Sequence, residues 1–243
     1  MINKKQIICI LTRYLNQYWI DFLKNFTQYE TYLVIDDYST IHNKIIEGVH
    51  IIQVDDETCR KHNYYNSSSW TNLKDIISWD RALYYFNHVE TDYENIWFLE
   101  DDVFIMSEKT LVDIDKQYPQ SDLLTSFHEI NPNGDIYSGW NHWVNVIHRI
   151  GTPWAHSLVC ACRLSRRLME RVDNYLNDRH LMIIEALFNT LAIHYNYTVI
   201  NPIEMATTIQ YNIPCDHNNI NTNYIYHPVK KIEDQIFIRN KYA

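Results

Sequence analysis

Short strand-like runs alternate with helical patterns along most of this 243-residue chain, and this order constrains the fold more than any other feature. Alternating or wholly apolar runs predict strands at 6–13, 32–39, 50–55, 95–105, 122–127 and 156–165. Apolar residues at helical spacing predict helices at 16–28, 76–89, 166–177 and 181–195. The remainder is expected to form loops and a tail. This order is typical of an α/β protein with a mainly parallel central sheet flanked by helices.

The sequence shows no boundary between domains. Only four glycines and six prolines punctuate it, and it contains neither an internal repeat nor a low-complexity linker. Hydrophobic residues make up 46% of a length that suits one large domain. One domain over residues 1–243 is therefore expected.

Signals for export or membrane insertion are missing from the sequence. The first apolar run is short and meets Thr12 and Arg13 before any small-residue cleavage site, and no segment approaches the ~20 apolar residues of a membrane-spanning helix. The five cysteines are an odd number without a C-x-x-C pair, which favours reduced structural thiols. A soluble chain with a cytoplasmic location is expected.

The charge balance excludes one broad class of function. The chain has 30 acidic and 21 basic residues and a formal net charge of −9. A general nucleic-acid binder needs a basic face for its phosphate contacts, so no nucleic-acid partner is expected. A small ligand or a neutral partner fits this composition better.

The strand predicted at 95–105 carries three consecutive carboxylates, Glu100, Asp101 and Asp102. Three negative charges at one point repel one another, so either a bound cation or access of water must compensate them. Carboxylate oxygens suit Mg²⁺ or Mn²⁺, and an added imidazole favours Mn²⁺. An ordinary solvated turn is the alternative interpretation.

A second acidic pair, Asp36 and Asp37, follows the apolar part of the strand predicted at 32–39. In open α/β sheets, ligands bind at the carboxyl ends of the strands, where both acidic groups are expected. A helix cap and a turn residue are the alternative for this pair. The sequence has no glycine-rich phosphate loop, so a nucleotide diphosphate would have to be met by a metal held on carboxylates.

One carboxylate, Glu185, lies inside a strongly apolar helical pattern. Apolar residues surround it on nearly all sides, so the helix at 181–195 is expected to be largely buried. A carboxylate there needs a partner or a function, and desolvation would raise its pKa towards that of a general base. The alternative is a charge on the solvent face or in an ion pair.

Aromatic residues gather in a glycine-flanked segment after the middle of the chain: Trp140, His142, Trp143 and Trp154. Flat rings of this kind pack in a core or stack against sugars. The sequence leaves both interpretations open, and an acceptor-binding surface is the one favoured here.

Four segments in order, “ILTR”, “VIDDYS”, “SWDRALYYF” and “WFLEDDVFI”, resemble glycosyltransferases of the GT-A fold. In that family an acidic D-x-D type motif binds the divalent cation that clamps a nucleotide-sugar diphosphate, and “EDD” is a variant of it. “HLMIIEALFNTLA” is similar to the helix that carries a catalytic Glu in some inverting members, including branching N-acetylglucosaminyltransferases. “IYHPVK” resembles the late His that often completes the metal site.

The resemblance covers most of the chain and implies a single GT-A-like, Rossmann-like domain. Its nucleotide-binding half would span about 1–105, and its acceptor and catalytic half about 106–243. Asp102 and His227 would bind the metal, while Asp101 or Glu100 would bind the ribose or reach the metal through water. For His227, a packed loop residue is the alternative.

The resemblance also implies roles around the donor. Asp36 and Asp37 would receive the uracil or ribose, and Asp80 and Arg81 would face the nucleotide or the donor sugar. Glu185 would be the general base for an inverting transfer. Lys230 or Arg239 would neutralise the departing diphosphate.

The resulting hypothesis is a metal-dependent glycosyltransferase of the hexosyl- or N-acetylhexosaminyltransferase class. It would move a sugar from a nucleotide-sugar donor, a UDP-sugar by preference, to a hydroxyl of a glycan or glycoconjugate with Mn²⁺ or Mg²⁺ as cofactor. A metal-dependent phosphohydrolase or nucleotidyltransferase is a rival, against which the missing glycine loop and D-x-D-x-[TV] motif count. A Ca²⁺-dependent carbohydrate-binding module is a second rival, and it leaves Glu185 unexplained.

Overall fold

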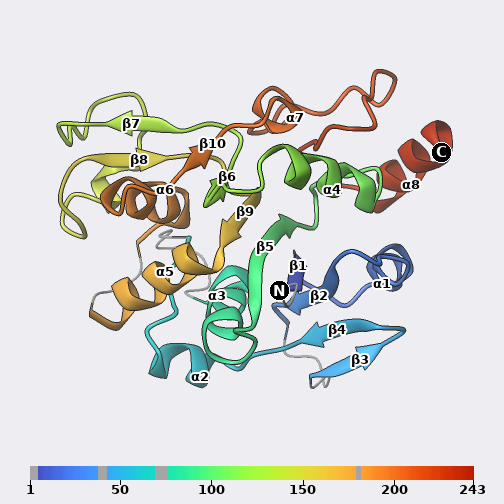
Figure 1. The fold of residues 1–243 in the computed structure, drawn as a ribbon, viewed down its shortest axis with the longest axis horizontal. Coiled ribbons are helices and arrows are strands. Elements are labelled where there is room, and N and C mark those ends of the chain that lie inside the picture. Colours follow the sequence, from blue (N-terminus) through green and yellow to red (C-terminus); the bar gives the residue numbers. More distant parts are fainter. Residues whose placement is uncertain (1–4, 38–42, 69–75, 179–181) are drawn as a thin grey trace.

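One large sheet runs through the protein in the computed structural model, which describes residues 5–37, 43–68, 76–178 and 182–243 (Figure 1). Its strand order is β10-β6-β9-β5-β1-β2-β4-β3. The strands are β1 (Lys5–Thr12), β2 (Glu30–Ile35), β3 (Lys44–Ile46), β4 (Val49–Ile52), β5 (Tyr93–Glu100), β6 (Leu123–Leu124), β9 (Ala161–Ser165) and β10 (Val199–Ile200). Among these described strands, β3 and β9 pair antiparallel with their neighbours, and the other pairings are parallel. The expectation of an α/β fold with a mainly parallel central sheet is confirmed.

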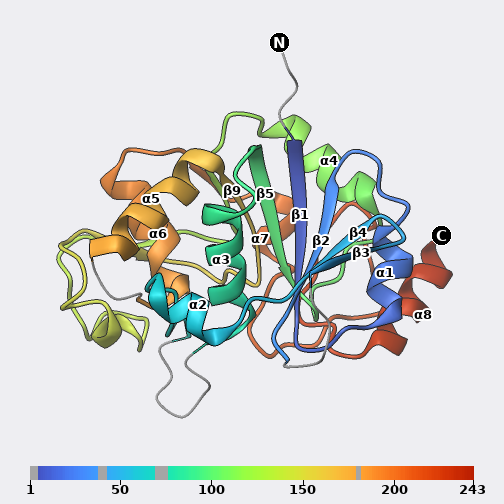
Figure 2. The same cartoon turned by 90° about the horizontal axis from the view of Figure 1, so that it is seen from below.

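Helices cover both faces of this sheet, as the edge-on view in Figure 2 shows. They are α1 (Gln17–Leu23), α2 (Asp56–Lys61), α3 (Ser78–His88), α4 (Glu108–Gln117), α5 (Arg166–Asp178), α6 (Ile184–His194), α7 (Ile203–Ala206) and α8 (Ile232–Tyr242). Helices α3, α5 and α6 pack on one face, and α1 and α4 on the other. None of the helices in the described part of the chain has the length and apolar character needed to cross a bilayer.

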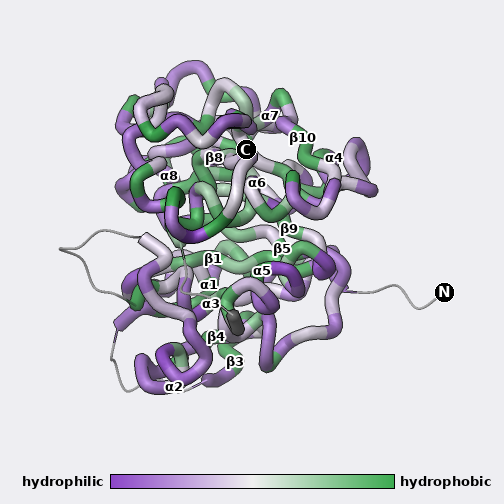
Figure 3. The backbone as a smooth tube through the Cα atoms, turned by 90° about the vertical axis from the view of Figure 1, so that its left-hand side faces the viewer, coloured by the Kyte–Doolittle hydropathy of each residue, from purple (hydrophilic) through white to green (hydrophobic). Residues whose placement is uncertain are grey.

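The continuous apolar run of β1 follows from this double coverage. Successive side chains of a strand point to opposite faces, and both faces are buried here. Ile7, Cys9 and Leu11 therefore enter the core beneath α3, α5 and α6, whereas Ile8 and Ile10 enter the core beneath α1 and α4. In Figure 3, hydrophobic residues are concentrated along the central strands.

Several segments differ from the prediction, because α2, α4, α7, β3 and β10 form where loops were expected. The strand expected at 156–165 is divided into β8 (Trp154–His156) and β9, and β8 pairs with β7 (Glu129–Asn131) in a separate two-stranded sheet. Between β7 and β8 lies a loop with a short 3₁₀ helix, η1 (Trp143–Asn145). The expected tail contains α8, which the sequence patterns did not predict. Residues 38–39 and 181, at the margins of two predicted elements, lie outside the described residues.

Candidate active site

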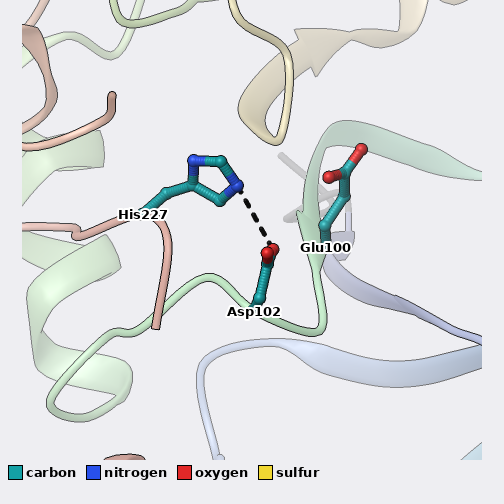
Figure 4. Close-up of side chains that lie close together, drawn as sticks. All are labelled: Glu100, Asp102 and His227. Atoms are coloured by element: carbon teal, nitrogen blue, oxygen red, sulfur yellow. Dashed lines mark ion pairs between the residues drawn. The ribbon is translucent and has the colours of Figure 1, made fainter. Parts of the chain in front are cut away.

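The three acids at the end of β5 occupy a tight turn, and each carboxylate meets a different neighbour. Trp79 Nε1 on α3 donates to Glu100 Oε1 at 2.8 Å. The Thr12 hydroxyl at the end of β1 donates to Asp101 Oδ2 at 2.8 Å. Asp102 faces the C-terminal segment, where its Oδ1 lies 3.3 Å from His227 Nε2 (Figure 4).

Backbone pairing brings the distant histidine to this turn. Phe104 and Tyr226 exchange two backbone hydrogen bonds of 2.8 and 2.9 Å, and the Val229 amide donates to the Asp102 backbone oxygen at 2.7 Å. His227 lies within this pairing, so the position of its ring follows from the main chain on both sides. Sequence spacing alone could not show this contact.

The ring orientation of His227 suits a metal ligand. Its Nδ1 lies 2.8 Å from the backbone oxygen of Gln210. A carbonyl oxygen only accepts hydrogen bonds, so Nδ1 carries a hydrogen and Nε2 is the atom turned to Asp102. Metal-binding histidines commonly donate their second ring nitrogen to a carbonyl or carboxylate in this way.

Glu100, Asp102 and His227 together form the candidate metal site. One ligand atom from each residue lies within 4.8 Å of the others. Two carboxylate oxygens and one imidazole nitrogen fit Mn²⁺, and the carboxylates also fit Mg²⁺. Over the described ranges, His227 is the only basic side chain in an ion pair with one of the three acids of the turn. The donor set therefore fits a divalent cation.

The electrostatics of the turn show a shortage of positive charge. Burial raises the pKa of Glu100, and the charges of Asp102 and Asp101 raise it further against the hydrogen bond from Trp79. Burial likewise raises the pKa of Asp101, opposed by the hydrogen bond from Thr12. For His227, burial alone would lower the pKa, but the hydrogen bond and charge of Asp102 raise it above its ordinary value. Each shift corresponds to a site that favours an added proton or cation.

A cavity of about 300 Å³ opens beside these ligands. Glu100, Asp102 and His227 line it together with Trp79 and Glu185. Glu185 stands in the first turn of α6, which begins at Ile184 rather than at the predicted residue 181. The two carboxylates that sequence analysis assigned to metal binding and to base catalysis, Asp102 and Glu185, thus line one cavity.

Glu185 has the electrostatic character of a base that works near neutral pH. Burial raises its pKa to about 7, and the nearby charge of Glu100 contributes. No residue in the described part of the chain makes a hydrogen bond or an ion pair with its carboxylate. A carboxylate with such a pKa can accept a proton from a bound hydroxyl, provided that the hydroxyl lies within hydrogen-bond reach.

Two predicted nucleotide contacts, Asp36 and Arg81, are bound to each other beside the sheet. Arg81 Nε lies 3.2 Å from Asp36 Oδ1, and Arg81 Nη2 lies 2.7 Å from Asp56 Oδ1. Arg81 also donates to the backbone oxygen of Val54 and is 1% exposed. Asp37 follows directly, with its backbone oxygen accepting from the Gln53 amide. None of these residues lines the cavity.

Asp80, the other predicted nucleotide contact, is fully buried near the start of α3. Its carboxylate accepts hydrogen bonds from the backbone and hydroxyl of Ser67 at 3.1 and 2.9 Å, and from the Ile77 amide at 2.8 Å. Ser67 and Ile77 themselves line the cavity. Asp80 therefore holds two residues of the cavity wall in place by hydrogen bonds, but it does not line the cavity itself.

The two predicted diphosphate contacts lie in different places. Lys230 is exposed and lines the cavity. Arg239 lies on α8, where its guanidinium is 3.8 Å from the centre of the Phe22 ring and its Nη2 donates to the Ile105 backbone oxygen at 2.7 Å. Burial lowers the pKa of Arg239 to about 9. Only Lys230 is placed to face a ligand in the cavity.

The aromatic residues predicted to bind an acceptor gather around the β7–β8 hairpin, and none of them lines the cavity. Trp143 and Trp154 are 0% and 3% exposed, so they belong to the core. Trp140 is half-buried and stacks on His156 with ring centres 4.3 Å apart, and His142 packs edge-on against Trp140. Of the four, only Trp140 and His142 keep exposed surface.

Several residues of the site carried no signal in the sequence. Trp79 was part of a predicted helix, but nothing marked it as the partner of Glu100. Gln210 was part of no predicted element, although its backbone oxygen orients His227. Tyr211 is 71% exposed and lines the cavity next to it. Each contact depends on segments that are distant in sequence.

No known family profile and no curated protein matches this sequence. Among solved structures, 4-diphosphocytidyl-2C-methyl-D-erythritol synthase from Anaerococcus prevotii is 11% identical, with a TM-score of 0.45 over 98% of this chain and 96% of that one. Mouse xyloside xylosyltransferase 1 is 10% identical, with a TM-score of 0.37 over 82% and 84%. Core-mannan synthase A from Aspergillus fumigatus, in its Mn/GDP form, is 10% identical, with a TM-score of 0.38 over 76% and 69%. At these values the likenesses do not place the chain in a family.

Proposed function

We propose that this protein is a metal-dependent glycosyltransferase that uses a nucleotide-sugar donor. The observation that carries the proposal is the placement of Glu185, with its raised pKa, in the same cavity as Glu100, Asp102 and His227. A metal site in the same cavity as a candidate general base suits an inverting sugar transfer from a nucleotide-sugar donor. A cation-binding module alone gives no reason for an unpaired carboxylate with a pKa of about 7.

The metal ligands in this proposal are Asp102, His227 and Glu100. A divalent cation bound there supplies positive charge for the diphosphate of a UDP-sugar, which the acidic turn would otherwise repel. Asp101 is assigned to the ribose, and Asp36 and Asp37 to the uracil or ribose. The acidic surroundings make Mn²⁺ or Mg²⁺ a condition of donor binding.

Glu185 is the proposed catalytic base. Its carboxylate removes the proton of an acceptor hydroxyl while the hydroxyl oxygen attacks the anomeric carbon of the donor. The bond from that carbon to the diphosphate breaks on the opposite face, so the configuration is inverted. Lys230, exposed at the cavity, pairs with the charge of the departing diphosphate.

The acceptor is proposed to be a hydroxyl of a glycan or glycoconjugate, and the transferred group a hexose or an N-acetylhexosamine. Trp140 and His142, the two residues of the hairpin group with exposed surface, are the candidates for contact with the acceptor. The chain would act as one domain, with the nucleotide held by about 1–105 and the acceptor by about 106–243.

A screen of nucleotide sugars tests this function. Each sugar is incubated with the protein in Mn²⁺ or in EDTA, and release of the free nucleoside diphosphate is measured, because transferases slowly give their donor to water. We expect Mn²⁺-dependent release from one donor, and its loss in the Asp102→Asn variant. Release that continues in EDTA, or turnover of no donor sugar, would contradict the proposal.

A further inference from the structure

One buried side-chain amide forms hydrogen bonds with both segments that carry the candidate metal ligands. Gln235 on α8 is 0% exposed. Its Nε2 donates to the backbone oxygen of Asp101 at 3.0 Å and to that of Val229 at 3.1 Å. Asp101 directly precedes Asp102, and Val229 lies two residues after His227. The two hydrogens of one amide group thus connect the two halves of the site.

Neighbouring groups fix the orientation of this amide. The Tyr18 hydroxyl on α1 donates to Gln235 Oε1 at 3.0 Å. Because the two backbone oxygens only accept, the amide nitrogen must face them and the amide oxygen must face Tyr18. Arg239, one turn further along α8, donates to the same hydroxyl and to the Ile105 backbone oxygen. The amide therefore has one satisfied orientation.

We propose that Gln235 is the positioning residue that sets the separation of Asp102 and His227. It reinforces the hydrogen bond from the Val229 amide to the Asp102 backbone oxygen, which joins the same two segments at 2.7 Å. Gln235 touches no ligand atom itself, and it acts through the main chain. That the fixed distance serves metal binding rests on the proposed function.

This role makes α8 part of the site, although it lies outside the cavity. Metal affinity depends on ligand positions, and loss of outer partners of metal ligands typically costs 10- to 100-fold in affinity. Arg239, predicted from sequence to meet the diphosphate, belongs to this support: its guanidinium packs against Phe22 and Phe104 and holds Tyr18 in place.

The test uses the full chain and the Gln235→Met variant, which keeps the side-chain volume and removes both donors. In the metal-free protein, hydrogen exchange at the Val229 amide is measured by NMR. Loss of the amide bonds should speed it about tenfold or more relative to amides in β1. In a second measurement, Mn²⁺ binding by calorimetry should weaken about 10- to 100-fold.

Asn131 supplies a matched control. It is 4% exposed, and its side chain makes two hydrogen bonds with the backbone of Asp135 in the β7–β8 hairpin. Asn131→Leu should lower thermal stability without changing Val229 exchange or Mn²⁺ affinity. If Gln235→Met does not fold, Tyr18→Phe keeps both amide donors and removes the hydroxyl that orients the amide and accepts from Arg239. It should change both quantities in the same direction by less.

The outcomes separate the two proposals. Unchanged Val229 exchange in the Gln235 or Tyr18 variant would overturn the positioning role, as would an equal change in the Asn131 control. A lower melting temperature with unchanged Mn²⁺ affinity, measured on folded protein, would reduce Gln235 to a structural residue. A wild-type protein that binds no Mn²⁺ would remove the proposed function, while the exchange data would still decide whether Gln235 fixes the two segments.

Discussion

Carboxylates near the two ends of strand β5 lie in opposite surroundings. Near the first residues of the strand, Asp122 is 1% exposed and accepts from Arg167 Nη2 at 2.5 Å and from the Thr198 amide at 2.9 Å. Burial alone would raise its pKa, but the hydrogen bonds, the largest of them from Arg167, hold the pKa below its ordinary value. The acid is ionised and compensated by the protein itself.

At the other end of β5 the balance is reversed. Glu100 and Asp101 have raised pKa values, and in the described part of the chain no arginine or lysine forms an ion pair with either of them or with Asp102. The same fold thus pairs one carboxylate with arginine and leaves a cluster of three with only a histidine. The cation proposed above would supply the compensating charge at the second end.

The strongest test of this contrast is Asp102→Asn. The substitution removes a proposed metal ligand and one negative charge, so transfer should fall by about 10³-fold or more. Because repulsion within the turn also falls, the metal-free variant should be no less stable than the wild type. Transfer assays and thermal unfolding on one preparation check both statements, and wild-type turnover would remove Asp102 from the site.

A second variant, Glu185→Gln, tests the cavity next to the acidic end of β5. The substitution keeps the shape and removes the proton acceptor, so turnover should fall on the order of 10²- to 10³-fold while UDP and Mn²⁺ affinities stay unchanged. In the wild type, a base with a pKa of about 7 must lose its proton to act, so kcat/KM should rise with pH and level off above about 7. That rise should be absent from the variant.

A structural Glu185 would behave differently. Glu185→Gln would then change the melting temperature or donor affinity and leave the rate per folded molecule close to that of the wild type. Such a result would show that Glu185 has a structural role in α6.

Cation addition should stabilise the acidic end of β5, where the described part of the chain offers no arginine or lysine ion pair. At 100 times its Kd, a ligand that binds only the folded protein adds about 2.7 kcal/mol to the free energy of unfolding. For a chain of this length, the melting temperature should rise by roughly 5–10 °C with Mn²⁺ and return with EDTA. The matched Asp102→Asn protein should show little of this shift.

The smallest expected effect compares single neutralised acids at the two ends of β5. Asp122→Asn should lower the free energy of unfolding by about 1–3 kcal/mol, because the Thr198 amide and the exposed Arg167 guanidinium lose the charged form of a buried acceptor. Glu100→Gln should leave the metal-free protein unchanged or slightly more stable, since it relieves repulsion and an amide oxygen still accepts from Trp79. Denaturant unfolding measures the free energy of unfolding of both variants. Equal decreases in the two would contradict the difference between the two ends of β5.

What the sequence could predict depended on local pattern. The apolar run of β1, the acidic end of β5 and the carboxylate in α6 are all visible within about ten residues, and their placement follows from strand direction and helix burial. The fold class was within reach for that reason, whereas the family resemblance implied that Asp102 and Glu185 share a site.

The remaining features depend on contacts that no local pattern encodes. The resemblance implied that Arg81 faces the nucleotide or donor sugar and that Arg239 can meet the diphosphate. In the structure Arg81 is bound by Asp36 and Asp56, and Arg239 packs on aromatic rings. Trp143 and Trp154 looked like a sugar-stacking surface, but pairing of β7 with β8 places them in the core. The role of Gln210 in orienting His227 appears only when the C-terminal segment is docked.

The docking of that segment has a consequence for how the protein is made. Asp101 and Gln235 are 134 positions apart. The candidate metal site therefore brings together one segment that is synthesised early and another that is synthesised late. Closing so long a loop carries a large entropic cost. A metal ion bound across it would in principle stabilise the folded state correspondingly more. A nascent chain that has reached only the end of β5 presents its acids without the histidine. The proposed cation would therefore stabilise the fold only late in synthesis, after His227 has been added.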